Sequence, residues 1–178
     1  MTRDARKISL FLAALLLAGL NGSPALAEPF GPYEAGGGYW ADNSEHTFFY
    51  NNLTGPVRNL IEGRRLYALD PTRMTTTLQT TSFNSDTDVL VYDDNYGSGF
   101  PPGKWECMAV LSDYERCGQG RILVNLYFNT NAALACQEIG HSTGLGHSTE
   151  SGSCMIQNSD VGGTNFTPHD KLHINGRY

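Results

Sequence analysis

The stretch that decides the fold is residues 136–148, with the sequence CQEIGHSTGLGHS. Gln137 and His141 are four residues apart, and residues at this spacing lie on the same face of an α-helix. Both side chains can therefore point at one metal ion, with Glu138 beside them to polarise a metal-bound water. The stretch predicts a helix that carries a metal site.

The residues that follow this helix extend the same pattern. Gly144 can adopt a left-handed conformation and end the helix, so that the chain turns and His147 reaches the same ion. The spacing is that of the zinc-ligand pattern H-E-x-x-H-x-x-G-x-x-H, with Gln137 in place of the first histidine. Met155 follows in Cys154-Met155-Ile156, where such sites carry a methionine turn beneath the metal.

Composition bounds the remaining possibilities. The chain has 178 residues, 40% of them hydrophobic and 17% charged, which indicates one globular domain rather than a disordered segment. Its 18 acidic and 12 basic residues give a net charge of -6, which disfavours a nucleic-acid partner.

The start of the chain has the features of a signal peptide. Basic residues near the N-terminus precede an apolar run over 8–20 and an A-x-A cleavage site at 25–27. We expect a signal peptide over 1–27, a domain over 28–178, and a secreted, extracellular protein with no membrane contact after cleavage. The apolar run is too short to span a bilayer as a helix, and an uncleaved membrane anchor is the alternative.

The four cysteines all lie in the expected mature part, and an even number in an exported chain predicts two disulfides. Three pairings are open. We prefer the sequence-local one, Cys107 with Cys117 and Cys136 with Cys154, in which the second bridge ties the metal helix to the methionine turn. A cysteine zinc site is the alternative, although no C-x-x-C spacing is present.

Hydrophobic patterns predict an α+β fold with about five strands and three helices. Asn131 is the expected N-cap of the metal helix, and Thr167 to Asp170 form a capping box that opens the last helix. The expected strands are 46–50, 74–80, 87–92, 108–112 and 121–129, and the expected helices are 56–68, a helix from 132, and 168–176.

On the segments QEIGHSTGLGH and SCMI, the chain resembles the metzincin zinc metallopeptidases, and within them the matrixins. It matches a C-Q-E-x-G-H variant of the motif found in several secreted matrixin-like proteins. The order of expected elements is similar to the matrixin catalytic domain over essentially all of 28–178. The resemblance implies a zincin-like domain with a twisted mixed sheet and an active-site helix followed by a Met-turn.

The resemblance also implies a function. His141 and His147 would be Zn²⁺ ligands together with Gln137, Glu138 would be the general base, and Met155 would be the turn methionine. The protein would be a secreted zinc endopeptidase that acts on protein or peptide substrates, and we expect a monomer.

Gln137 motivates a second hypothesis. An amide oxygen is a weaker zinc ligand than an imidazole, so the chain could instead be a zincin-fold binding module with little or no turnover. A third hypothesis is an exported structural domain without metal.

Three other groups of residues have simpler interpretations. His169 and His173 form a second pair four residues apart, but Asp170 between them is explained as a capping residue, and a metal role for the pair is the lesser alternative. His46 is expected to be structural. Calcium could bind at Asp93, Asp94 and Asn95, although acidic turn residues are usually only solvated.

Overall fold

The computed structural model describes residues 29–31, 38–157 and 162–178. The expected signal peptide and its cleavage site lie outside these residues. Within them, no helix is long and apolar enough to cross a membrane.

The centre of the fold is a sheet of six strands. Four of the pairings between its strands are parallel and one is antiparallel. The strand order is β1-β6-β4-β2-β3, and β5 pairs with β6 along its other side. The strands are β1 (Trp40–Ala41), β2 (Glu45–Tyr50), β3 (Thr75–Gln79), β4 (Val89–Asp94), β5 (Gly103–Val110) and β6 (Arg116–Asn125).

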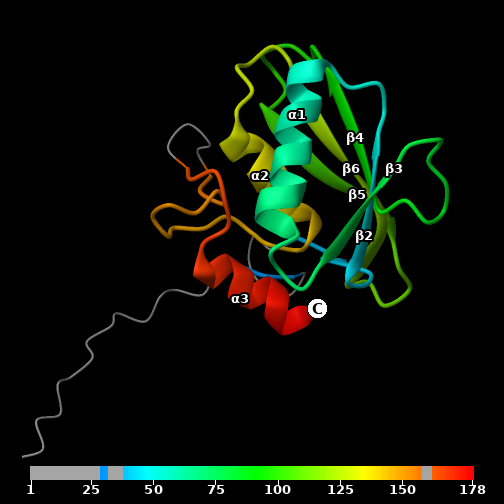
Figure 1. Cartoon of the computed structure of the whole chain (residues 1–178), viewed down its shortest axis with the longest axis vertical. Helices are drawn as coiled ribbons and strands as arrows, with labels where there is room; N and C mark the ends of the chain where they lie inside the picture. The colour runs from blue at the N-terminus through cyan, green and yellow to red at the C-terminus, as the bar shows by residue number, and fades with distance from the viewer. Residues whose placement is uncertain (1–28, 32–37, 158–161) are drawn as a thin grey trace, which may run out of the picture.

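Three α-helices accompany the sheet in the described part of the chain (Figure 1). α1 (Gly55–Arg64) and α2 (Ala132–Ser142) pack against each other and against the sheet, while α3 (Pro168–Arg177) lies at one end of the molecule. Alternate residues of the strands face the helices because side chains alternate across a strand. Phe48, Val91 and Ile122 thereby share one core with helix residues such as Ile61 and Ile139.

The helix boundaries follow from local chemistry. Thr167 and Asp170 cap each other's backbone N–H groups at the start of α3, which confirms the expected capping box. α1 was expected to run to residue 68, but it ends at Arg64 and continues as a π-helical segment, η1 (Arg65–Leu69). The Asp70 N–H donates to the Arg65 carbonyl, five residues back, while the buried Arg65 guanidinium forms a 2.7 Å ion pair with Glu62.

The fold class is the expected α+β, with corrections to the sheet. It has six strands rather than five, because the two-residue β1 pairs with β6. The expected strands 108–112 and 121–129 are each displaced: β5 and β6 both begin five residues earlier and end before the predicted ends. Tertiary packing explains the shift, since the Trp105 ring of β5 lies against Gly120 of β6, a residue whose type argued against a strand.

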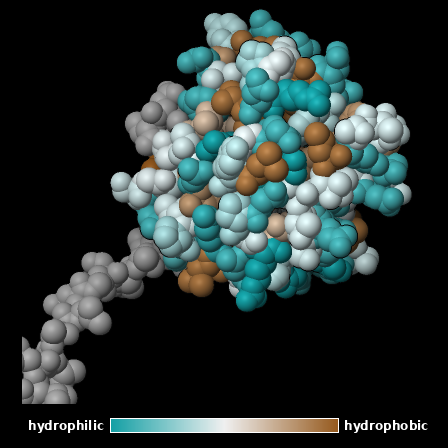
Figure 2. Space-filling model, viewed as in Figure 1, coloured by the Kyte–Doolittle hydropathy of each residue, from teal (hydrophilic) through white to brown (hydrophobic). Residues whose placement is uncertain are grey.

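The structure contains both expected disulfides, Cys107–Cys117 and Cys136–Cys154. The first joins β5 to β6, and the second joins α2 to the segment that contains Met155. On the face shown in Figure 2, hydrophobic residues are interspersed among polar ones.

Candidate metal centre

The helix α2 is fixed at its start and along its buried face. The Asn131 side chain accepts a 2.9 Å hydrogen bond from the Leu134 N–H, which is the expected N-cap. Met155 is fully buried and packs against Gly140, where an added Cβ would lie 2.2 Å from the methionine sulfur. Met155 therefore packs against α2 at Gly140, the residue before His141.

His141, near the end of α2, is oriented by the chain that follows it. Its Nδ1 lies 2.7 Å from the Leu145 carbonyl oxygen, which can only accept, so Nδ1 carries the proton and Nε2 keeps its lone pair. Burial lowers the pKa of His141 to about 4, helped by the neighbouring His147 and opposed by the bond to Leu145. A neutral imidazole with one nitrogen anchored to a carbonyl is the usual state of a metal-ligating histidine.

The turn after α2 brings His147 back to His141. Gly144 has a φ of 101°, the left-handed conformation expected from the sequence. The turn is held by the N-terminal segment, because the Gly31 N–H donates to the Gly144 carbonyl and the Gly146 N–H donates to the Pro29 carbonyl. The rings of His141 and His147 lie with their centroids 4.9 Å apart, and burial lowers the pKa of His147 as well.

Gln137 lies one helical turn before His141 and lines the same pocket. Its amide nitrogen donates a 2.7 Å hydrogen bond to the Ile156 carbonyl, next to Met155. This bond uses the amide N–H group and leaves the side-chain oxygen as the only atom of Gln137 that could bind a metal. The Gln137 side chain thus has a structural role, the hydrogen bond to the Ile156 carbonyl, that a histidine ligand at this position would not have in the same way.

Glu138 is almost completely buried at the back of the pocket. The backbone N–H of Trp105, in β5, donates to its carboxylate, while Oε2 has no hydrogen-bond partner among the described residues. Burial raises the pKa of Glu138 to about 8, partly opposed by the bond from Trp105. A raised pKa of this kind is a feature that carboxyl groups at proton-transfer sites share.

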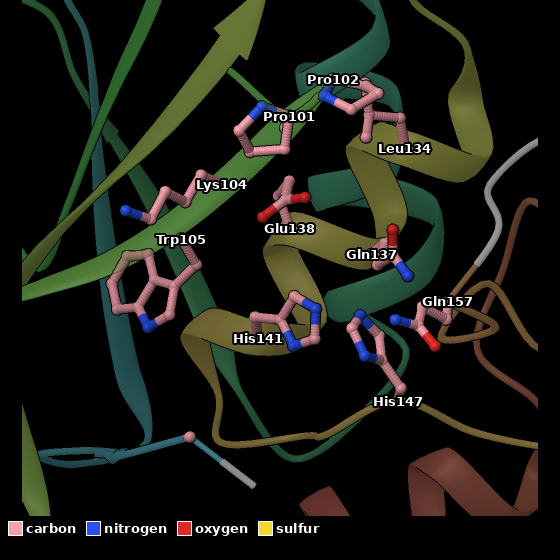
Figure 3. A pocket seen from close by; sticks show the side chains of 12 residues that line it. Pro101, Pro102, Lys104, Trp105, Leu134, Gln137, Glu138, His141, His147 and Gln157 are labelled. Carbon is pink, nitrogen blue, oxygen red and sulfur yellow. The ribbon is translucent and has the colours of Figure 1, made fainter. Parts of the chain in front are cut away.

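These residues share one pocket of about 430 Å³ (Figure 3). Figure 3 shows the imidazoles of His141 and His147 facing each other, with Gln137 and Glu138 on the preceding turn of α2. The opposite wall comes from β5 and the loop before it, and Gln157 closes a further side. The wall residues that the sequence did not single out are Gly38, Pro101, Pro102, Gly103, Lys104, Trp105, Leu134 and Gln157.

No local pattern could have found this wall, because residues 101–105 reach α2 only through the pairing of β5 with β6. The Asn125 side chain fixes the loop before β5. It donates to the carbonyls of Gly97 and Phe100 and accepts from the Tyr96 N–H. A buried amide with satisfied donors and acceptors fixes a loop in one conformation.

The remaining candidate residues lie outside the pocket. His46 is buried in the core, as expected, with Nε2 3.0 Å from the Ser142 hydroxyl. Asp93 accepts from the N–H and hydroxyl of Thr54, and Asp94 accepts from the Asn95 N–H, so these acids act as turn and capping groups. His169 and His173 lie together on α3.

The residues present fit a zinc ion in part. His141 and His147 offer two neutral imidazoles, and the unpartnered Glu138 Oε2 lies in the same pocket. Within the described ranges, no three His, Cys, Asp or Glu side chains are grouped to hold one ion, so the third protein ligand would be of another type. Gln137 is such a residue.

Comparison of the chain with models of known protein families, and with curated protein sequences, finds no match.

Proposed function

We propose that the protein is a secreted, zinc-dependent endopeptidase of the matrixin-like type. The observation that carries the proposal is the facing pair His141 and His147, in one pocket with a carboxylate, Glu138, that has an uncommitted oxygen. This combination of two neutral imidazoles and one adjacent carboxylate is what metal-assisted hydrolysis needs.

His141 Nε2, the His147 imidazole and the side-chain oxygen of Gln137 would hold the ion. When bound, zinc would supply Lewis-acid chemistry, lowering the pKa of a water and polarising a substrate carbonyl. Glu138 would take a proton from the attacking water and return it to the leaving amine, which is general acid–base catalysis by one group. The backbone N–H of Trp105 would hold the Glu138 carboxylate in place at the pocket wall.

The substrate would lie along β5. In the described residues β5 pairs only with β6, and its other edge lies beside the pocket, where the Trp105 backbone N–H donates to Glu138. An extended peptide can add to such an edge through main-chain hydrogen bonds. The endopeptidase proposal therefore includes a binding mode that depends on backbone rather than on a particular side chain.

The experiment is digestion of an unstructured protein, such as reduced and alkylated casein, by the zinc-loaded protein. Glu138→Ala should lower the rate by about 10²–10⁴-fold, the usual contribution of general acid–base catalysis. Glu45→Ala, a change of an exposed glutamate at the start of β2, is the matched control and should digest like wild type. Activity that survives in Glu138→Ala would remove the mechanism.

A second candidate function is a metal-binding or substrate-binding module of the same fold without turnover. The hydrogen bond from Gln137 to the Ile156 carbonyl favours it, because that bond holds the position of the first ligand in a structural role. Stoichiometric zinc in the purified protein without any digestion would favour this module. Absence of both zinc and digestion would leave an exported structural domain.

Secretion is part of the first proposal. Two disulfides within the domain fit an oxidising compartment. Mass spectrometry of protein from the culture medium should give an N-terminus at Glu28.

A further inference from the structure

We propose that His169 and His173 form a second zinc site, on the surface of α3, independent of the candidate centre on α2. The two residues are four apart, so both side chains project from one face of α3. Their Nε2 atoms lie 3.3 Å from each other, and the rings meet at 82° with centroids 4.7 Å apart.

The separation of the two nitrogens fits a shared ion. Two imidazole nitrogens bound to one tetrahedral zinc at about 2.0–2.1 Å lie about 3.3–3.4 Å apart. Square-planar coordination at a similar bond length would place cis nitrogens only about 2.8–2.9 Å apart. An ordinary hydrogen bond from nitrogen is about 2.7–3.2 Å long, so the observed 3.3 Å is long for a direct bond between the rings. The geometry thus favours zinc over square-planar metals.

The backbone that carries the pair is already fixed. The capping box of Thr167 and Asp170 sets the first turn of α3, and the Asp170 carboxylate also accepts a 2.9 Å hydrogen bond from the Ser153 hydroxyl. At the other end of the helix, the Tyr178 hydroxyl donates to the Thr143 carbonyl and accepts from the Ala41 N–H. Because α3 is already ordered, binding an ion between its two histidines costs little further conformational entropy.

The surroundings leave room for the rest of the coordination shell. Both histidines are half-buried, and the Phe30 ring lies 5.5 Å from the His173 ring. Beside His173 is an open hollow of about 300 Å³, in which the Arg177 guanidinium stacks 3.9 Å above the Trp40 ring. Since no third His, Cys, Asp or Glu joins the pair in the described residues, water would fill the other positions. Such a site is exchangeable rather than permanently loaded.

The test is equilibrium dialysis of the full mature protein against zinc chloride, with magnesium chloride as the control for charge alone. The double variant His169→Gln/His173→Gln should bind one zinc equivalent fewer than wild type. This difference does not depend on the centre on α2: wild type binds two ions if that centre is occupied and one if it is not. Equal stoichiometry of wild type and the double variant would overturn the proposal.

Single variants test whether the two rings act together. His169→Gln and His173→Gln should each weaken zinc binding at this site by tenfold or more, because the second imidazole binds intramolecularly once the first is attached. Lys171→Gln, a change on the same helix between them, is the matched control and should leave zinc binding unchanged. A site that tolerates either histidine substitution is not the two-histidine site proposed.

NMR spectra of the imidazole nitrogens test the proposal on the wild-type protein, whose fold no substitution has disturbed. The chain has five histidines, so their signals can be assigned by single substitutions. Zinc should shift the Nε2 signals of His169 and His173 together, and magnesium should shift neither. Unmoved signals for this pair under excess zinc would contradict the proposal, whatever happens at His141 and His147.

Discussion

The two histidine pairs of this chain are held in different ways. His141 is half-buried, its Nδ1 is tied to the Leu145 carbonyl, and Met155 packs against its helix at Gly140. His169 and His173 are half-buried as well, and their Nε2 atoms lie 3.3 Å from each other. His141 is therefore oriented by a backbone carbonyl of the fold, whereas the second pair shares one surface of an already capped helix.

The surroundings of His141 also affect its protonation, because desolvation lowers its pKa. A desolvated imidazole is kept neutral, so its protonation costs folding free energy. The predictions below disturb the core and the surroundings of α2 one at a time, beginning with the largest expected effect.

Lowering the pH should destabilise the fold through the buried His46. Burial lowers the pKa of His46 to about 4, below the ordinary value of 6.5, so the unfolded chain binds a proton in this range that the folded protein does not. Stability from this group is complete above pH 6.5 and is lost as the pH falls towards 4, by about 3 kcal/mol in total.

Urea unfolding of wild type and His46→Gln between pH 4 and pH 7.5 measures this effect. The difference between the two proteins cancels the titration of the acids they share, including Asp88, whose pKa burial raises to about 7. A difference in unfolding free energy that stays constant over this range would show that His46 does not titrate with folding.

Removing a disulfide should separate global stability from support of the centre on α2. The bridges join residues 10 and 18 positions apart, and the cost grows only with the logarithm of loop length, so Cys136→Ala/Cys154→Ala and Cys107→Ala/Cys117→Ala should each cost about 3 kcal/mol. Only the first joins α2 to the Met155 segment, and only its loss should weaken zinc binding at His141 and His147. Thermal unfolding and zinc titration check this, and equal zinc affinities in the two variants would refute it.

Gly140→Ala should force α2 away from Met155. The new Cβ would lie 2.2 Å from the methionine sulfur and 3.0 Å from the Phe166 ring, an overpacking expected to cost about 1–3 kcal/mol. Gly63→Ala, in α1, is the matched control, because nothing lies within 4 Å of its added Cβ, and it should be neutral or stabilising by up to about 1 kcal/mol. Denaturant unfolding of both variants decides, and similar losses in both would show that contact with Met155 is unimportant.

Gln137→His tests the candidate ligand position on α2 and has the smallest expected effect. A third imidazole at this helical position should raise zinc affinity by tenfold or more, about 1.4 kcal/mol. The change also removes the bond to the Ile156 carbonyl, so part of the gain is offset by looser packing of the turn. Titration against a competing chelator, followed through the imidazole signals of His141 and His147, measures the balance at this centre, and His169→Ala in parallel should leave the affinity there unchanged. A fall in affinity at His141 and His147 in His169→Ala would mean that the third ligand comes from α3.

Local chemistry made much of the helical part of the molecule predictable. Asn131 caps α2, Gly144 takes the left-handed conformation, and Thr167 and Asp170 form the capping box, each for reasons contained in a few neighbouring residues. The cysteine pairing followed from sequence separation. The spacing of Gln137, His141 and His147 placed all three in one pocket.

The rest depended on contacts between distant segments. The register of β5 against β6 follows from Trp105 lying over Gly120, and no period in either segment encodes that contact. The same pairing brings Lys104 and Trp105 to α2. The bond from Gln137 to Ile156 was likewise invisible, because a glutamine in a ligand position can serve either as ligand or as support.

The contact between the N-terminal segment and the turn after α2 affects when this part of the fold can form. Synthesis delivers Pro29 and Gly31 early, but their partners Gly144 and Gly146 emerge late, and Phe166, which packs at Gly140, emerges later still. Contacts between residues so far apart in the chain form slowly, after the local contacts. A nascent chain that has not reached Phe166 therefore lacks part of the packing against Gly140, so the surroundings of α2 are completed only near the end of synthesis.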